Sequence, residues 1–149
     1  MPDTFLIHVV DDDEAVRLSL RMLLEASGYT AHVYRSAEAF LATLAGKVPG
    51  PQFGCLLLDV HMPGGMDGLS LLDELRQRGV ILPTVVITGQ GDVPLAVRAM
   101  RAGAMDFIEK PYDEDQLLSL LEATKVQSRD IQFADRRRAG ADERLAMLG

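Results

Sequence analysis

The stretch CLLLD at Cys55–Asp59 is followed directly by the turn-rich stretch VHMPGG at Val60–Gly65. A continuous apolar run of this length, bounded by turn signals, predicts a β-strand that is covered on both faces of a sheet. Asp59 would then lie at the carboxyl end of that strand. Ligands bind at this edge of open parallel sheets, so we expect a site around Asp59 if other strands deliver suitable partners.

The same pattern of apolar strand and following helix recurs along the chain. Helical spacing of apolar residues after each run, with glycines as stops, predicts the intervening helices. This alternation predicts an α/β fold with a parallel, doubly wound sheet. The four other predicted strands are Thr4–Val10, Thr30–Tyr34, Thr84–Thr88 and Met105–Glu109. The predicted helices begin at Glu14, Ala37, Leu69, Asp92 and Asp113.

Short polar side chains stand where these helices begin. We expect Asp13, Ser36 and Asp92 to act as N-caps, and Asp113 with Gln116 to form a capping box. Asp13 is therefore a structural residue in this interpretation and not a metal ligand.

The composition excludes several classes of protein. The 149 residues include 22 acidic and 15 basic residues, a formal net charge of −7 that argues against a domain coating nucleic acid or anionic lipid. The single cysteine, Cys55, cannot form an internal disulfide and is expected to be a core residue. No apolar stretch approaches the roughly 18 residues of a membrane span, and no signal pattern opens the chain. We expect a cytoplasmic protein without membrane contact.

The pattern changes near Ser128, which predicts a domain at residues 1–127 and a linker or extended C-terminal helix at residues 128–149. Arg136–Arg138 forms a basic run that we interpret as a solvated face, with nucleic-acid contact as the weaker alternative. Gly140 is expected to interrupt any helix in this segment.

Polar residues at the predicted strand ends would meet at one edge of the sheet. Asp11, Asp12 and Asp59 would repel one another unless a cation were present, and oxygen ligands of this kind suit Mg²⁺, with Mn²⁺ as a possible substitute. Thr88 and Lys110 would add a hydroxyl and an ammonium. These are the groups needed to accept a phosphoryl group, so we predict an aspartyl-phosphate at Asp59.

These residues together resemble a bacterial response-regulator receiver domain, over roughly residues 4–127. The resemblance rests on the paired acids Asp11 and Asp12, Asp59-x-x-Met62-Pro63 with Gly68, Thr88-Gly89, and Lys110-Pro111. Residues 85–94 and 102–111 are especially similar to the FixJ-like branch, which usually carries a LuxR-type helix-turn-helix. The resemblance implies a flavodoxin-like (βα)5 fold with a five-stranded sheet of order 2-1-3-4-5.

The resemblance also implies a role for each residue of the site. Asp59 would be the phosphoacceptor, Asp12 a direct Mg²⁺ ligand, Asp11 a ligand through water, and His61 a ligand through its backbone carbonyl. The His61 imidazole is the weaker alternative. Lys110 would contact the phosphoryl group.

A conformational switch and a cis peptide bond are implied as well. Thr88 would move toward the phosphoryl group, and Phe107 would turn inward as it does so. His61 and Gln90 occupy the positions that tune the lifetime of the phosphoryl group, and the Lys110-Pro111 bond is expected to be cis.

The implied function is that of a two-component receiver. A sensor histidine kinase would phosphorylate Asp59, and the domain would dimerise through the helix after Asp92, the strand Met105–Glu109 and the helix after Asp113. DNA would be bound only by an output domain outside residues 1–149. The domain would not be an enzyme, apart from catalysing its own phosphorylation and dephosphorylation. One alternative is a stand-alone phosphorelay or protein-interaction module without DNA binding, and another is a hydrolase that uses an aspartyl-phosphate intermediate.

One position departs from the pattern of the family. Relatives usually have one residue between Met-Pro and the next apolar position, whereas Gly64-Gly65 places two before Met66. A longer, glycine-containing loop is expected to be more flexible.

Overall fold

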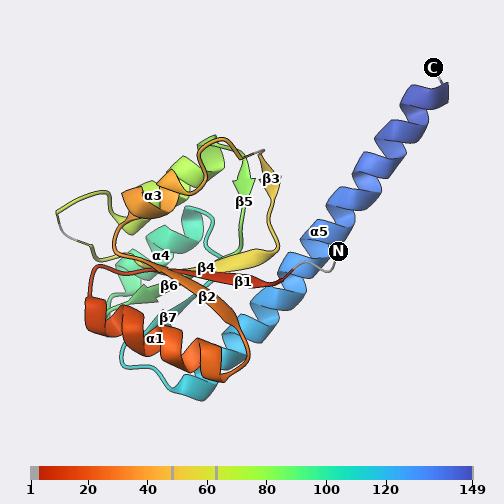
Figure 1. Ribbon diagram of the computed structural model, residues 1–149. Coiled ribbons are helices and arrows are strands. Elements are labelled where there is room, and N and C mark those ends of the chain that lie inside the picture. Colours follow the sequence, from red (N-terminus) through yellow and green to blue (C-terminus); the bar gives the residue numbers. More distant parts are fainter. Residues whose placement is uncertain (1–3, 48, 63, 149) are drawn as a thin grey trace.

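The computed structural model describes residues 4–47, 49–62 and 64–148, and for residues 139–148 it describes the backbone only. In chain order the elements are β1 (Leu6–Val10), α1 (Glu14–Ala26), β2 (Thr30–Tyr34), α2 (Ala37–Ala42), β3 (Gly50–Pro51), β4 (Gly54–Asp59), α3 (Gly68–Gln77), β5 (Val80–Ile81), β6 (Thr84–Thr88), α4 (Val93–Arg101), β7 (Asp106–Glu109) and α5 (Glu114–Leu148). Figure 1 shows their arrangement.

A five-stranded parallel sheet of order β2-β1-β4-β6-β7 forms the centre of the domain. Without the two short strands β3 and β5 this is the order 2-1-3-4-5, so the predicted fold is confirmed. All six residues of β4 are buried, as expected for the strand in the middle of the sheet. Its carboxyl end, Asp59, pairs in register with Ile87 of β6.

Helices lie on both faces of this sheet (Figure 1), and an apolar core fills the space on each face. On one face, Leu56 and Leu58 pack with residues of α2, α3 and α4, including Phe40. On the other face, Cys55 and Leu57 pack with residues of α1 and α5. Side chains alternate along β4 and both faces are covered, which is why the sequence of this strand is apolar without interruption.

Three of the predicted N-caps are confirmed by their hydrogen bonds. The Asp13 carboxylate accepts from the backbone N–H groups of Ala15 and Val16, at 2.9 and 3.3 Å. Ser36 Oγ accepts from the third residue beyond it at 3.0 Å, and Asp92 Oδ1 does the same at 3.3 Å. Asp113 Oδ1 accepts from the Asp115 N–H at 3.2 Å.

A second, two-stranded parallel sheet was not predicted. Gly50–Pro51 lies outside every predicted strand and helix, but it forms β3 and pairs with Val80–Ile81 of β5. The pairing joins segments about thirty positions apart, and strands of two residues carry too little periodicity to be found from sequence.

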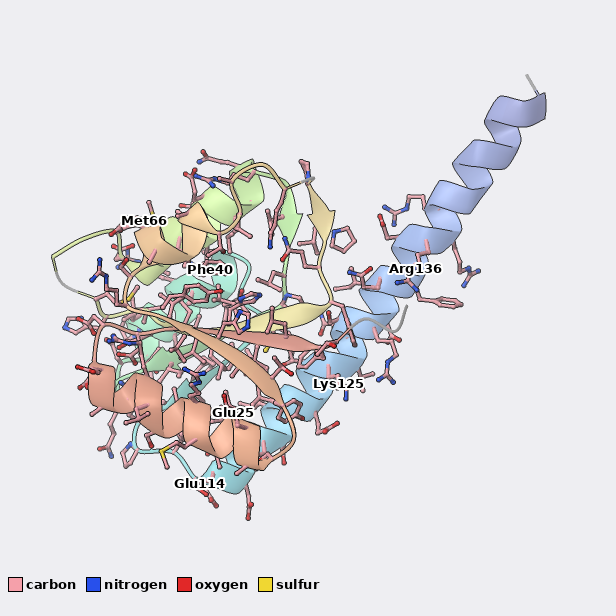
Figure 2. All side chains as sticks on the ribbon, in the orientation of Figure 1. Glu25, Phe40, Met66, Glu114, Lys125 and Arg136 are labelled. Carbon is pink, nitrogen blue, oxygen red and sulfur yellow. The ribbon has the colours of Figure 1, made fainter. Side chains whose placement is uncertain are left out.

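Helix α5 continues far beyond the expected domain boundary (Figures 1 and 2). Ser128 is 1% exposed and still packs on the domain, whereas Arg136 lies on the part of the helix that projects from it. The prediction that Gly140 breaks the helix is wrong, because α5 runs through it to Leu148. A single glycine in a long helix costs only about 1 kcal/mol relative to alanine, which does not end the helix. Within the described part of the chain, no helix is both long and apolar enough to cross a membrane.

Candidate functional site

The site is built at the carboxyl edge of the central sheet. Asp11 follows β1 and is 1% exposed, and Asp59 ends β4 and is 7% exposed. Because β1 and β4 are neighbouring parallel strands, their ends bring these two carboxylates together although 48 positions separate them. Asp12, the next residue, is exposed.

Three carboxylates and one ammonium converge there. Oxygen atoms of Asp11, Asp12 and Asp59 all lie within 4.8 Å of one another. Lys110 follows β7 and places Nζ 3.7 Å from Asp59 Oδ2 and 3.9 Å from Asp11 Oδ2. The predicted gathering of Asp11, Asp12, Asp59 and Lys110 is therefore present in the structure.

The residues present fit a hard divalent cation. Among the described residues, none forms a hydrogen bond with the buried Asp11 Oδ2, although buried polar atoms normally have a partner. The pKa of Asp11 is raised to about 6, mainly by burial; the neighbouring Asp59 carboxylate contributes to this rise, and the Asp13 N–H and Lys110 oppose it. A cation with oxygen ligands would satisfy this atom and neutralise the repulsion among the carboxylates.

Backbone groups hold the two buried carboxylates in place. The His61 N–H donates to Asp59 Oδ1 at 2.9 Å, and the Asp13 N–H donates to Asp11 Oδ1 at 2.9 Å. The other oxygen of each carboxylate is the one nearest Lys110. Each acid is thus oriented by a residue two positions further along the chain.

Close packing requires a glycine at position 68, as the distances from Gly68 show. A Cβ atom at this position would lie 2.7 Å from Val60 Cα and 3.2 Å from the Asp59 carbonyl oxygen. The start of α3 therefore packs directly on the backbone that carries Asp59, and only glycine leaves room for it. Pro63, which belongs to the same sequence motif, lies outside the described residues.

The other predicted residues occupy the neighbouring strands. Thr88 ends β6 and is 1% exposed, and within the described part of the chain no group forms a hydrogen bond with its buried hydroxyl oxygen Oγ1. Its carbonyl accepts from the Lys110 N–H at 2.8 Å. Phe107 is partly buried on β7 against the core that contains Phe40. Gln90 and the side chain of His61 are exposed beside the strand ends.

Two contacts at the site were not anticipated from sequence. Arg17 Nη1 donates to the Asp11 carbonyl at 2.8 Å, one turn into α1. Glu38 Oε1 accepts from the Met66 N–H at 2.8 Å, and thereby joins α2 to the loop after β4. Neither residue has a sequence signal beyond its place near a helix start.

The Lys110-Pro111 bond is cis, as predicted.

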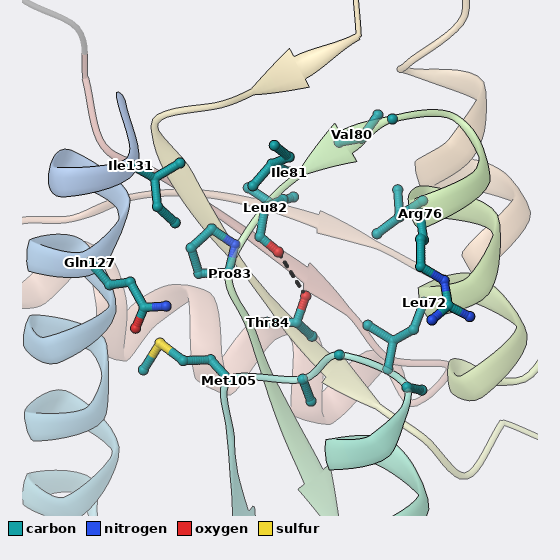
Figure 3. Close-up of a pocket in the computed structure, with 15 residues that line it drawn as sticks. Leu72, Arg76, Val80, Ile81, Leu82, Pro83, Thr84, Met105, Gln127 and Ile131 are labelled. Carbon is teal, nitrogen blue, oxygen red and sulfur yellow. Dashed lines mark hydrogen bonds between the residues drawn. The ribbon is translucent and has the colours of Figure 1, made fainter. Parts of the chain in front are cut away.

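A hollow of about 590 Å³ lies at the opposite end of the sheet (Figure 3). Its lining includes Pro83 and Thr84 at the start of β6, Met105, and Gln127 and Ile131 of α5. Thr84 Oγ1 donates within this lining to the Leu82 carbonyl at 3.0 Å. The acidic site is at the carboxyl end of the same strands, so this hollow takes no part in its chemistry.

The fold and site define a class: a doubly wound α/β domain with an acidic, lysine-bearing cluster at the carboxyl edge of its sheet. Residues 7–122 match the model of the response regulator receiver domain. The chain belongs to this family.

Individual relatives agree with that assignment. The chain is 45% identical over 148 residues to the transcriptional regulatory protein FixJ of Azorhizobium caulinodans, covering 99% of this chain and 68% of that protein. It is also 45% identical over 117 residues to FixJ of Bradyrhizobium diazoefficiens, covering 78% of this chain and 55% of that protein. The solved structure of the response regulator StyR superposes with a TM-score of 0.85 at 35% identity, over 99% of this chain and 72% of that one. The chain is therefore shorter than each of these relatives.

Proposed function

We propose that the chain is a receiver domain phosphorylated on Asp59 by a sensor histidine kinase, and that it controls transcription through a DNA-binding output domain outside residues 1–149. The observation that carries the phosphoacceptor assignment is the position of Asp59, with Lys110 Nζ 3.7 Å from its Oδ2 and two further carboxylates within 4.8 Å. The FixJ relatives are transcriptional regulatory proteins, which supports the proposed output.

The Asp59 carboxylate is the nucleophile in this proposal. One of its oxygens forms a bond to phosphorus while the bond from phosphorus to the kinase histidine nitrogen breaks, and the departing imidazole takes up a proton. Lys110, oriented between Asp59 and Asp11, would donate to a phosphoryl oxygen. The His61 N–H holds Asp59 in position during the transfer.

Mg²⁺, or Mn²⁺ in its place, would be held by Asp12 and Asp59 directly, by the His61 carbonyl, and by Asp11 through water. The ion supplies neutralisation of the charge that builds on the phosphoryl oxygens. The buried, unpartnered Oδ2 of Asp11 supports a ligand at this position. Self-catalysed phosphorylation from small donors and dephosphorylation belong to the same proposal, with exposed His61 and Gln90 setting the access of water.

The switch would act through Thr88 and Phe107. The buried Thr88 hydroxyl has no hydrogen-bond partner in the resting protein, so a phosphoryl oxygen at Asp59 would offer it one. Phe107 on the adjacent β7 would follow into the space that Thr88 leaves. The change biases a two-state equilibrium through one local charge.

Dimerisation on phosphorylation would use α4, β7 and α5. Val93, Val97 and Met100 are 58%, 42% and 40% exposed on α4, and exposed apolar residues at helical spacing support a contact surface. Residues 1–127 would form the receiver, and residues 128–149 would be the extended helix that leads to the output domain. The stand-alone phosphorelay module is less favoured, because the FixJ relatives are longer than this chain.

The test compares the wild-type chain with Asp59→Asn in the presence of Mg²⁺ and beryllofluoride or acetyl phosphate. The wild type is expected to gain a phosphoryl mass from acetyl phosphate and to shift toward dimer with either reagent, measured by intact-mass spectrometry and light scattering. Asp59→Asn is expected to show neither change. An unmodified wild type, or an equal response of the variant, would contradict the proposal.

A further inference from the structure

The loop that leads into α3 is hydrogen-bonded to α2, a helix that packs in the same apolar core as α3. Glu38 lies in the first turn of α2, and its Oε1 accepts the Met66 N–H at 2.8 Å over a separation of 28 residues. Met66 lies on the loop just before α3 (Figure 2). A carboxylate that accepts a backbone N–H forms a charge-assisted hydrogen bond, which is stronger than a neutral one.

Gly65 provides the space for this contact. A Cβ atom at Gly65 would lie 3.2 Å from Glu38 Oε2, which is tighter than most Cβ contacts, and 3.5 Å from Oε1, which is an ordinary contact. The preceding Gly64 has a φ of +88°, which favours glycine. The two glycines thus let the loop turn and let the Glu38 carboxylate approach its backbone.

The hydrogen bond between Glu38 and Met66, called the clasp below, ends two residues before Gly68, which packs on the Asp59–Val60 backbone. Met66 precedes the α3 N-cap, Asp67, whose Oδ1 accepts from the Ser70 N–H at 2.8 Å. Gly68 follows, and a Cβ there would be 2.7 Å from Val60 Cα and 3.2 Å from the Asp59 carbonyl oxygen. This close packing is the route by which a displacement of Met66 would reach the Asp59–Val60 backbone.

We infer that Glu38 is a positioning residue for the phosphoacceptor: its clasp on the Gly65–Met66 backbone holds the start of α3 against Asp59 and so fixes the geometry in which the site binds its divalent cation. Glu38 itself is exposed and stands on a different element from every ligand. It acts through the loop and touches neither the ion nor the phosphoryl group. The inference rests on the proposed function of Asp59.

The experiment measures the Mg²⁺ dissociation constant of the full chain by calorimetry, and the rate of phosphorylation by acetyl phosphate at saturating Mg²⁺. Glu38→Ala is expected to weaken Mg²⁺ binding about threefold, the effect of losing one exposed hydrogen bond. Glu38→Gln keeps an acceptor oxygen and is expected to restore most of the affinity. Glu114→Ala removes an equally exposed first-turn glutamate from α5, and it serves as the control for the loss of one negative charge.

A double-mutant cycle separates the clasp from a general loss of stability. Gly65→Ala alone is expected to weaken Mg²⁺ binding by crowding the Glu38 carboxylate, and to have little further effect in Glu38→Ala, because the contact is already lost. The inference would be overturned if the effects of Gly65→Ala and Glu38→Ala on Mg²⁺ binding were additive. It would also be overturned if Glu38→Ala and Glu114→Ala bound Mg²⁺ with the same affinity. Failure of the wild type to bind Mg²⁺ or to accept a phosphoryl group would instead refute the proposed function.

Discussion

Replacing Asp11 with Asn should make the metal-free protein more stable. Burial raises the pKa of Asp11 from 3.8 to about 6, so its ionised form is disfavoured in the folded state. A shift of one pKa unit corresponds to about 1.36 kcal/mol. Keeping Asp11 ionised in the folded protein at pH 7.5 therefore costs roughly 3 kcal/mol relative to the unfolded chain. The cost of roughly 3 kcal/mol already includes the attraction of Lys110, and Asn keeps the Oδ1 acceptor for the Asp13 N–H, so we expect Asp11→Asn to gain about 1–3 kcal/mol.

The assay is urea unfolding at pH 7.5, followed by far-ultraviolet circular dichroism because the chain contains no tryptophan. In EDTA, Asp11→Asn should unfold at a higher urea concentration than the wild type. In MgCl₂ at about 100 times the dissociation constant, the wild type should gain roughly 2.7 kcal/mol, and the variant should gain less. The exposed Asp12 provides the control: Asp12→Asn should change stability in EDTA by no more than about 0.5 kcal/mol.

The pH dependence has a defined sign. The pKa of Asp11 is higher in the folded than in the unfolded protein, so the folded protein binds the proton more tightly. The contribution of Asp11 to stability therefore rises as the pH falls from about 7 through 6 toward 3.8. Asp11→Asn should lack this contribution. A variant that is less stable than the wild type in EDTA would refute the reasoning, because it would mean that Lys110 and the Asp13 N–H more than offset the burial of the charge.

Two further predictions concern residues outside the site. Burial, with the nearby charges of His32 and Lys47, lowers the pKa of His8 from 6.5 to about 4. The unfolded chain therefore binds a proton at His8 more readily than the folded protein does. The stability of the fold falls as the pH drops below 6.5. His8→Gln should remove this loss, and its stability relative to the wild type, measured by urea unfolding, should improve by about 2 kcal/mol between pH 7.5 and pH 5; a difference independent of pH would contradict the assignment. Ser128 Oγ accepts from the Gly54 N–H at 3.0 Å and donates to the Gln52 carbonyl at 3.2 Å, so Ser128→Ala should cost about 1–3 kcal/mol in urea unfolding by leaving a buried donor unpaired. The exposed Ser119 of the same helix is the control, and an equal effect of Ser119→Ala would count against the buried contact.

The sequence predicted the sheet and the acids because their signals are local. An apolar strand that ends in a carboxylate, as at Cys55–Asp59, gives its position and its burial together, and the parallel α/β pattern then places every strand end at one edge. Asp11, Asp12, Asp59 and Lys110 were therefore predictable as a cluster without any knowledge of their distances. The N-caps were predictable for the same reason, since a cap is decided within four residues.

The features that the sequence did not predict depend on pairs of distant segments. The pairing of β3 with β5 and the contact of Glu38 with Met66 each join a few residues that carry no periodic pattern of their own. The hydrogen bond between Ser128 and Gly54 joins residues that are 74 positions apart. Such contacts are decided by how closely two backbones approach after the main sheet has formed, and no spacing rule within one segment reports that approach.

The hydrogen bonds of Ser128 also connect the long helix α5 to the strand that carries the phosphoacceptor. Gly54 begins β4 and Asp59 ends it, so α5 is hydrogen-bonded to one end of the strand whose other end carries the proposed phosphoryl group. Gln132, one turn further along α5, adds a hydrogen bond from Nε2 to the Pro51 carbonyl at 2.8 Å. These hydrogen bonds hold α5 against β4 and the segment before it at positions beyond residue 127, where composition placed the domain boundary. A shift of β4 on phosphorylation would reach the projecting helix through these hydrogen bonds, without requiring any movement of the helices that pack on the opposite face.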